Sequence, residues 1–332
     1  MYVVENYLTA VLFCIITMVC WGSWANTQKL ASESWSFTLF YWDYSLGIII
    51  LSLLFGLTFG SSGATGQSFI ENLSQSTPRI LALALMGGVL FNLANLLLVV
   101  AIDLAGMAVA FPIGIGLALV LGVFVNFIPH PGAYNSFVLF AGVGLVVMAI
   151  VINALVYKKM RQDVKSNKGI FISLVAGLLM SFFYRFVAES MSPSFKNIEP
   201  GTLTPYTAVF VFSMGVFISS FLFNTILMKR PVSGPVITFS NYFKNGSIKL
   251  HAIGILGGVI WCMGMLLSIM SGEKAGYAIS YGLGQGATLV AAIWGVFVWK
   301  EFKNSPKGTN GLLTVMFLSF LLGLSLIIIA KQ

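Results

Sequence analysis

Long apolar segments alternate with short polar connections along the whole chain. Ten such segments can be marked, and each is close to the length of about 20 residues that a helix needs to cross a bilayer. A helix satisfies its backbone N–H and C=O groups internally, as lipid requires, whereas a membrane β-barrel would show shorter segments of alternating polarity. The pattern predicts ten transmembrane helices, at residues 6–29, 36–59, 79–102, 105–128, 135–157, 169–190, 202–228, 250–272, 275–298 and 311–330.

The pattern of segments is repeated. Residues 87–120 align without a gap on residues 257–290, and twelve of the 34 positions are identical. Five predicted helices fall in each half, and an odd number of spans makes the second half run inverted relative to the first. We therefore expect an all-α integral membrane protein of two inverted five-helix repeats, in which the substrate site tends to lie at the repeat interface. The repeats are residues 1–160 and 161–332, forming one membrane domain without a soluble domain.

Composition excludes a soluble protein. Apolar residues make up 58% of the chain and charged residues 8%, with a mean hydropathy of +0.94, whereas soluble domains carry roughly 25% charged residues. The three cysteines lie in apolar segments without metal-ligand spacing, so neither a metal site nor a cofactor is expected.

Loop charges predict the orientation. The net charge is +8, and 13 of the 18 lysines and arginines lie in the loops that follow the odd-numbered helices. Basic loops face the cytoplasm, which predicts a multi-pass protein of the cell (inner) membrane with both termini outside. Because these residues are explained as topology signals, we expect no nucleic-acid partner.

Polar residues within the spans are the candidates for a substrate site, because such residues are costly in lipid. Ser23 and Asn26 share a face at the end of the first predicted helix, beside Trp21. The alternative is that they bond neighbouring helices together. Further candidates are Asn92 and Asn95, Gln285 and Thr288, and the aromatic residues Trp261 and Tyr281. For the two asparagines, a ligand and an interhelical partner are equally open.

Two glycine-rich runs occupy equivalent places in the fourth and ninth helices. A proline within a helix removes an amide donor, and clustered glycines lower helix stability. These runs are candidates for hinges or broken helices that expose carbonyl groups, with close helix packing as the alternative. The residues are Pro112, Gly114 and Gly116, and Gly282, Gly284 and Gly286.

Acidic residues in the spans are candidates for proton coupling. Asp43 lies about two turns into the second helix, and its alternative role is a pair with Lys29. Glu189 is the other candidate, although Arg185 is placed to form an i,i+4 ion pair with it. Asp103 and Glu273 are equivalent in the two repeats, and we expect them to cap the helices that follow.

Several of these residues resemble motifs of the ureide permease family, in the same order along nearly the whole chain. They are Trp-Gly-Ser-Trp at 21–24, Asp43-Tyr-Ser45, Thr58-Phe-Gly60, Gly87-Gly-Val89, Asn95-Leu96, Pro231-Val-Ser-Gly234, Gly272–Tyr277, Ile293-Trp-Gly295 and Lys300-Glu301. The resemblance implies the drug/metabolite transporter superfamily, near the glucose/ribose and rhamnose porters. It also implies ten helices in two inverted repeats, and proton-linked uptake of allantoin, uracil or similar neutral heterocycles.

This chain departs from the resemblance at three points. Plant members carry a longer central cytoplasmic segment, whereas residues 158–168 here form a short basic loop, and Phe111-Pro-Ile-Gly114 looks more like the sugar porters. Superfamily members are often drawn with both termini in the cytoplasm, opposite to the loop charges of this chain.

The sequence thus favours a secondary active transporter, a proton symporter for a small neutral polar metabolite such as a ureide or nucleobase. The expected partners are that solute, H+ and the lipid bilayer. A sugar porter and a drug/metabolite exporter are the alternative transporters, and a channel or receptor is harder to exclude. An enzyme is not expected, because His130 and His251 belong to no catalytic or metal motif and no Walker sequence is present.

Overall fold

The computed structural model describes residues 1–331 except for 32–34, 64, 161–165, 233 and 304. The predicted basic loop at 158–168 therefore lies partly outside the described residues. The described part is almost entirely helical and contains no β-strand beyond two isolated bridges. Within the described residues, ten helices are long and apolar enough to cross a membrane, and they coincide with the ten predicted segments. The prediction of an all-α protein with ten spans is thereby confirmed.

The first half of the chain forms five of these spans and one short helix. The first span is divided at Trp24 into two helices, and the short helix α4 lies between the second and third spans. The elements are α1 (Tyr7–Ser23) with α2 (Ala25–Ala31), α3 (Phe37–Leu57), α4 (Phe69–Gln75), α5 (Pro78–Ala105), α6 (Met107–Phe127), the 3₁₀ turn η1 (Pro131–Ala133) and α7 (Ser136–Met160).

The second half repeats this order with differences in its first and fourth spans. Its first span is the single helix α8, where the first half has α1 and α2. Its fourth span is broken into α12, α13 and a π-helical turn, where the first half has the continuous helix α6. The elements are α8 (Asn167–Ser190), α9 (Pro205–Lys229), α10 (Phe239–Asn245), α11 (Ile248–Ala275), α12 (Tyr277–Gly284), α13 (Ala287–Ile293), η2 (Trp294–Val298) and α14 (Thr309–Ile329).

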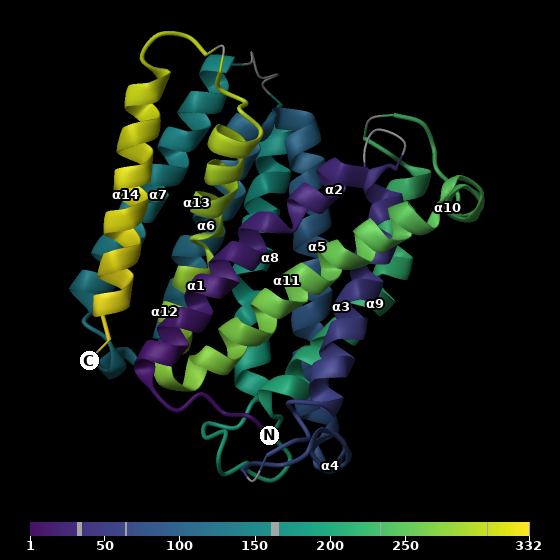
Figure 1. Ribbon diagram of the computed structural model, residues 1–332, viewed down its shortest axis with the longest axis vertical. Coiled ribbons are helices and arrows are strands. Elements are labelled where there is room, and N and C mark those ends of the chain that lie inside the picture. The colour runs from purple at the N-terminus through teal and green to yellow at the C-terminus, as the bar shows by residue number, and fades with distance from the viewer. Residues whose placement is uncertain (32–34, 64, 161–165, 233, 304, 332) are drawn as a thin grey trace.

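Equivalent short helices lie at opposite ends of the molecule. The bounds of α4 and α10 differ by 170 residues, which is the offset of the sequence repeat. Figure 1 shows α4 at the end that carries both termini and α10 at the other end. An inverted repeat requires this placement, and the inverted arrangement of the two halves remains a prediction.

Close approach of backbones joins the two halves, and it depends on glycine. A Cβ atom added at Gly88 of α5 would overlap the carbonyl oxygen of Phe212 in α9. A Cβ atom added at the equivalent Gly258 of α11 would overlap the carbonyl oxygen of Tyr44 in α3. Small residues permit such contacts between membrane helices, where dispersion rather than the hydrophobic effect drives association. Each half therefore packs its third span on the second span of the other half.

Alanine at either glycine should destabilise the fold. Overpacking costs about 1–3 kcal/mol, so Gly258→Ala and Gly88→Ala should each lower the thermal stability of the protein in nanodiscs. Gly144→Ala is the matched control, because Gly144 of α7 is exposed and a Cβ atom there meets nothing within 4 Å. Equal melting temperatures for Gly258→Ala and Gly144→Ala would contradict the tight packing.

Candidate functional site

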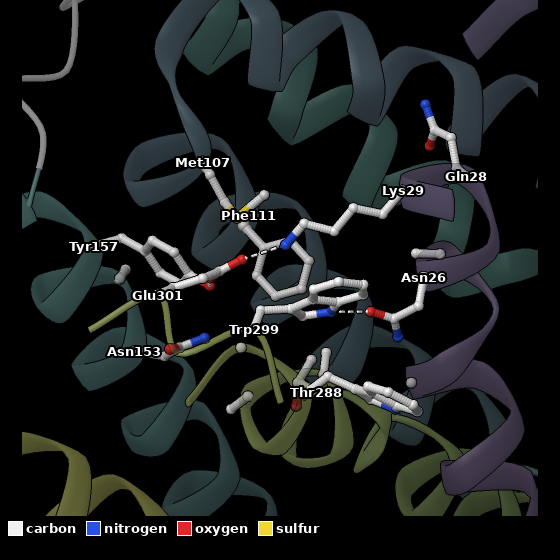
Figure 2. Close-up of a pocket in the computed structure, with 17 residues that line it drawn as sticks. Asn26, Gln28, Lys29, Met107, Phe111, Asn153, Tyr157, Thr288, Trp299 and Glu301 are labelled. Atoms are coloured by element: carbon white, nitrogen blue, oxygen red, sulfur yellow. Dashed lines mark hydrogen bonds and ion pairs between the residues drawn. The ribbon is translucent and has the colours of Figure 1, made fainter. Parts of the chain in front are cut away.

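A pocket of about 1080 Å³ opens at one end of the molecule, between α2, α6, α7 and α13 (Figure 2). Known ligand pockets occupy roughly 300–1,000 Å³, so a metabolite fits with water to spare. Three spans end at this side of the molecule and contribute to the lining. Lys29 lies near the end of the first span, Tyr157 lies near the end of the fifth span, and Glu301 follows the ninth span. The aromatic and polar lining residues include Asn26, Gln28, Lys29, Phe111, Asn153, Tyr157, Thr288, Trp294, Trp299 and Glu301.

Two interrupted spans shape the pocket. At the junction of α1 and α2, the Asn26 amide donates to the carbonyl of Ser23 over 3.1 Å. At the junction of α12 and α13, the Thr288 hydroxyl donates to the carbonyl of Gln285 over 3.0 Å. Each side chain satisfies a carbonyl freed at a helix end. The breaks thereby turn Asn26 and Thr288 toward the cavity that both line.

Indole groups tie these two spans together. The Trp294 Nε1 donates to Ser23 Oγ over 2.9 Å, and the Trp299 Nε1 donates to Asn26 Oδ1 over 2.6 Å. The π-helical turn η2 adds a residue to the helix between these two indoles and lets both face α1 and α2. Asn26 at the pocket wall, and Ser23 near it in the chain behind that wall, are therefore held by aromatic donors from the other half of the chain.

An ion pair crosses the pocket near its mouth. The Lys29 Nζ lies 2.6 Å from Glu301 Oε1 and 4.4 Å from the centre of the Trp299 ring. The Tyr157 hydroxyl donates to Glu301 Oε2 over 2.9 Å. Figure 2 shows Lys29 and Glu301 reaching toward each other above Trp299. Both charged side chains keep access to water, at 47% and 32% exposed, so a ligand can compete for them.

Asn153 of α7 adds an available amide to this wall. It lines the pocket, and the structure gives its side chain no hydrogen-bond partner among the described residues. An amide offers two donors and one acceptor oxygen. The site thus presents donors, acceptors and aromatic faces, and the described residues contain no cluster of metal-ligating side chains. Such a lining suits binding of a polar solute.

Two predicted aromatic residues, Trp21 and Trp261, do not line the pocket. Their rings stack with centroids 5.8 Å apart, and the Trp21 Nε1 donates to the carbonyl of Trp261 over 3.1 Å. Trp261 is 4% exposed and also packs on Phe91 and Phe212. This cluster belongs to the core, so a role in substrate binding requires that the core open.

The predicted asparagines of α5 bond across helices. Asn92 is fully buried, its Oδ1 accepts from the Tyr41 hydroxyl over 2.9 Å, and its Nδ2 donates to Ser219 Oγ over 2.7 Å. The Asn95 Nδ2 donates to the same tyrosine oxygen over 3.2 Å. Of the two possibilities that the sequence left open, these contacts favour interhelical bonding.

Tyr281 and Gln285 also lie outside the pocket lining. The Tyr281 hydroxyl donates to the carbonyl of Ala118 over 3.1 Å and approaches the carbonyl of Met180 at 3.3 Å, which joins α12 to α6 and α8. Gln285 is 9% exposed and stands at the helix break. Of the predicted binding residues, Asn26 and Thr288 line the pocket and Ser23 bonds to the lining residue Trp294, while the others lie in the core.

The two glycine-rich runs differ in structure. Helix α6 continues through Pro112, Gly114 and Gly116, so no break occurs in the first half. In the second half, α12 ends at Gly284 and α13 begins after Gly286. Close packing also uses these glycines: a Cβ atom at Gly177 would lie 2.5 Å from the Gly114 carbonyl oxygen, while Gly282 faces Val123 and Gly284 faces Trp21. A hinge role remains a prediction.

Asp43 has a different partner from the predicted Lys29, which pairs with Glu301 instead. Asp43 is 1% exposed, and its Oδ1 lies 2.9 Å from His251 Nδ1. The Tyr242 hydroxyl donates to the same oxygen. The expected pair with Lys29 is wrong because Lys29 lines the pocket and pairs there with Glu301.

The remaining acids lie away from the pocket. Glu189 is paired with Arg185 at 3.4 Å, as the i,i+4 spacing predicts. The expected capping by Asp103 and Glu273 is wrong, because α6 and α12 both begin at a glycine N-cap without a side-chain cap. Each acid lies in the last turn of the preceding helix, and Glu273 accepts from the Phe195 backbone N–H over 2.9 Å.

Loops at the end opposite to the pocket are tied together. The N-terminal ammonium donates to the carbonyl of Thr65 over 2.6 Å, and the Tyr206 hydroxyl donates to the carbonyl of Tyr2 over 3.1 Å. The Asn72 Oδ1 accepts from the Thr204 backbone N–H over 2.9 Å. These bonds hold the N-terminal segment and two loops against one another, so the large pocket and the tied loops lie at opposite ends.

Comparison with known proteins gives a consistent family. The family model of ureide permeases matches residues 40–168 and 166–330. Ureide permease 5 and Ureide permease 1 of Arabidopsis thaliana are 25% and 23% identical to this chain. The alignments cover 98% of it in both cases, and 95% and 98% of those proteins. A protein of Staphylococcus epidermidis described as "Probable glucose uptake protein GlcU" is 25% identical over 78% of the chain and 82% of its own length.

A solved crystal structure has the same fold. It superimposes with a TM-score of 0.60 at 14% identity, and the match covers 97% of this chain and 98% of the other.

Solvent access to the pocket can be measured with cysteines on α13. Ala291 lines the pocket, whereas Ile293 is 40% exposed on the outer surface of the same helix. In a background without native cysteines, Ala291→Cys should react with a membrane-impermeant maleimide several-fold faster than Ile293→Cys. The reaction should occur from the side of the basic loops alone. Equal labelling of both cysteines would remove the evidence for a water-filled pocket.

Proposed function

The chain belongs to the ureide permease family, and on this premise we propose that it is a secondary active transporter for a small, neutral heterocycle of the ureide or nucleobase class. Members of the family are transporters rather than enzymes, and the ten apolar helices make the chain a multi-pass membrane protein. One observation carries the proposal to a particular site: the pocket lined by residues of both halves, at the end of the bundle where Lys29 pairs with Glu301.

The lining suits the chemistry of a ureide. A ureido group places N–H donors beside a carbonyl acceptor in one plane. Glu301 can accept from such N–H groups, and Lys29 and Asn153 can donate to the carbonyl. Phe111 offers an aromatic surface for the plane of the ring. Because Lys29 and Glu301 already neutralise each other, the site favours a neutral ligand over an ion.

The pocket opens on the side of the basic loops. Loop charges predict that this side is cytoplasmic, so the conformation described here corresponds to a state open to the cytoplasm. The tied loops at the opposite end then form the closed outer face. Uptake requires a second state in which this end opens and the Lys29–Glu301 end closes.

Proton coupling is assigned to Asp43. An ionisable group inside a span is costly unless it serves a function or has a partner, and Asp43 is 1% exposed in the second span. Glu189 is the weaker candidate, because its side chain is 51% exposed and paired with Arg185.

Sugar uptake is the second candidate function. The match to a glucose uptake protein over 78% of the chain favours it, and aromatic side chains next to amides and carboxylates also suit a sugar ring. The two candidates differ in the ligand that the pocket should select, so a direct binding test separates them.

Blocking the pocket should abolish ligand binding. Ala154 is 9% exposed in the pocket wall, whereas its neighbour Leu155 is 46% exposed on the outer surface. We expect allantoin or uracil to raise the melting temperature of the purified protein and of Leu155→Trp, but not that of Ala154→Trp. A ligand at a hundredfold excess over its Kd stabilises the folded state by about 2.7 kcal/mol.

The same panel contains glucose, ribose and rhamnose as competitors. Stabilisation by sugars alone would support the second candidate function, sugar uptake, over the first. Stabilisation of Ala154→Trp equal to that of Leu155→Trp would contradict the placement of the site in this pocket.

A further inference from the structure

The short helices α4 and α10 occupy equivalent positions in the repeat, but different chemistry holds them in place. In α4 the contact is neutral: the buried Asn72 accepts from the Thr204 backbone N–H and donates to the carbonyl of Thr202 over 3.0 Å. In α10 the equivalent residue is Tyr242, and it donates to the carboxylate of Asp43 in α3. One end of the molecule is therefore fastened by an amide and the other by an ionisable group.

The contact at α10 is a cluster of four side chains. Tyr242 and His251 both bind Asp43 Oδ1, and their rings lie 4.6 Å apart. Trp35 packs edge-on against His251 with ring centroids 5.1 Å apart. Asp43 is 1% exposed and the His251 side chain is 28% exposed, so the acid is buried beneath partly exposed partners.

One oxygen of this buried acid is left without a partner. Asp43 Oδ2 makes no hydrogen bond among the described residues, while Oδ1 accepts two. Bonds to an ionised acceptor are about twice as strong as bonds between neutral groups. A proton placed on Oδ2 therefore neutralises the acid and weakens both bonds that hold α10 and α11 to α3.

Other charges do not compensate for this change. Lys29 of α2 is paired with Glu301, and Lys244 of α10, Lys249 of α11 and Lys229 of α9 are exposed at this end. Burial, together with the bond to Asp43, raises the pKa of Tyr242, so its hydroxyl remains a donor. Asp43 is thus the group of the cluster whose charge a proton can remove while Tyr242 remains a donor.

We propose that Asp43, His251 and Tyr242 form a proton-operated latch, in which a proton taken up at Asp43 Oδ2 neutralises the carboxylate and releases α10 from α3. This inference rests on the proposed proton coupling and names the element that moves. The equivalent contact of Asn72 at the other end does not respond to protons. Proton binding therefore loosens the pocket end of the bundle while the tied loops at the opposite end keep their contacts.

The consequence for the bundle follows from α11. Gly254 packs on Asp43, and one turn later Gly257 packs on Thr27 of α2. Helix α2 also carries Asn26 and Lys29 of the pocket. Helix α11 therefore connects Asp43 to the helix that carries pocket residues, so a change at the latch can be transmitted to the pocket wall.

Hydrogen exchange tests the latch without any substrate. We expect the protection of amides in residues 239–251, corrected for the intrinsic rate, to fall on the order of tenfold as the pH is lowered from about 8 to about 5. Protection of α4 should stay unchanged and provides the internal reference. Asp43→Asn should give low protection of α10 at every pH, because the amide resembles the protonated acid.

Two further variants keep the test decisive. Tyr242→Phe removes one donor and retains the fold's apolar contacts, so α10 should lose protection at both pH values. Asn72→Ala is the matched control, which should loosen α4 and leave the pH response of α10 intact. Parallel changes of α4 and α10 in the wild-type protein, or a wild-type pH response in Tyr242→Phe, would overturn the latch.

The latch and the proposed function fail in different ways. A pH response of α10 in a protein that the ligand panel does not stabilise would retain the latch and refute the substrate class. Proton-driven accumulation of a substrate with no pH response of α10 would refute the latch alone.

Discussion

Hydrocarbon offers no hydrogen-bond partner, and this constraint governs how every polar group in the bundle is used. Backbone groups are satisfied within helices, and the polar side chains of the spans turn to one another. Asn92 bonds to α3 and α9, and Tyr281 bonds to α6 and α8. Glycine makes these interhelical contacts possible, because Gly88 and Gly258 allow the backbones of helices from the two halves to approach each other closely. The Asn153 amide at the pocket and Asp43 Oδ2 are among the polar groups left without such a partner in the described residues.

Divergence between the repeats places the pocket. Phe111 lines the cavity from the unbroken helix α6, while its counterpart Tyr281 bonds to carbonyl groups in the core. The break between α12 and α13 and the π-helical turn after it have no equivalent in the first half. They bring Trp299 and Glu301 to Asn26 and Lys29. A symmetric pair of helices would lack this wall, so the asymmetry accounts for the placement of this pocket.

The ten spans can be predicted from the sequence because hydrophobic length is a local property. Asn26 and Thr288 can be predicted as site residues because polar side chains within a span are costly in lipid. The same pattern does not predict Lys29, Asn153, Tyr157 and Glu301 as pocket residues, since polar groups near helix ends resemble topology signals. Glu301 and Trp294 did stand in the family motifs, which was the available clue. Tertiary contacts cannot be predicted from this sequence alone, because residues such as His251 and Asp43 are 208 positions apart in the chain. Likewise, no local feature distinguishes a core asparagine such as Asn92 from one that binds a ligand.

The central claim is that this pocket serves proton-driven uptake of a neutral heterocycle. The most direct measurement is the uptake of radiolabelled allantoin and uracil by proteoliposomes that contain the purified protein, with a proton gradient imposed across the membrane. We predict that at least one of them accumulates above its equilibrium concentration and that a protonophore abolishes the accumulation. Uptake that only equilibrates, with or without the gradient, would contradict proton coupling, and the absence of uptake for both compounds would contradict the proposed substrate class.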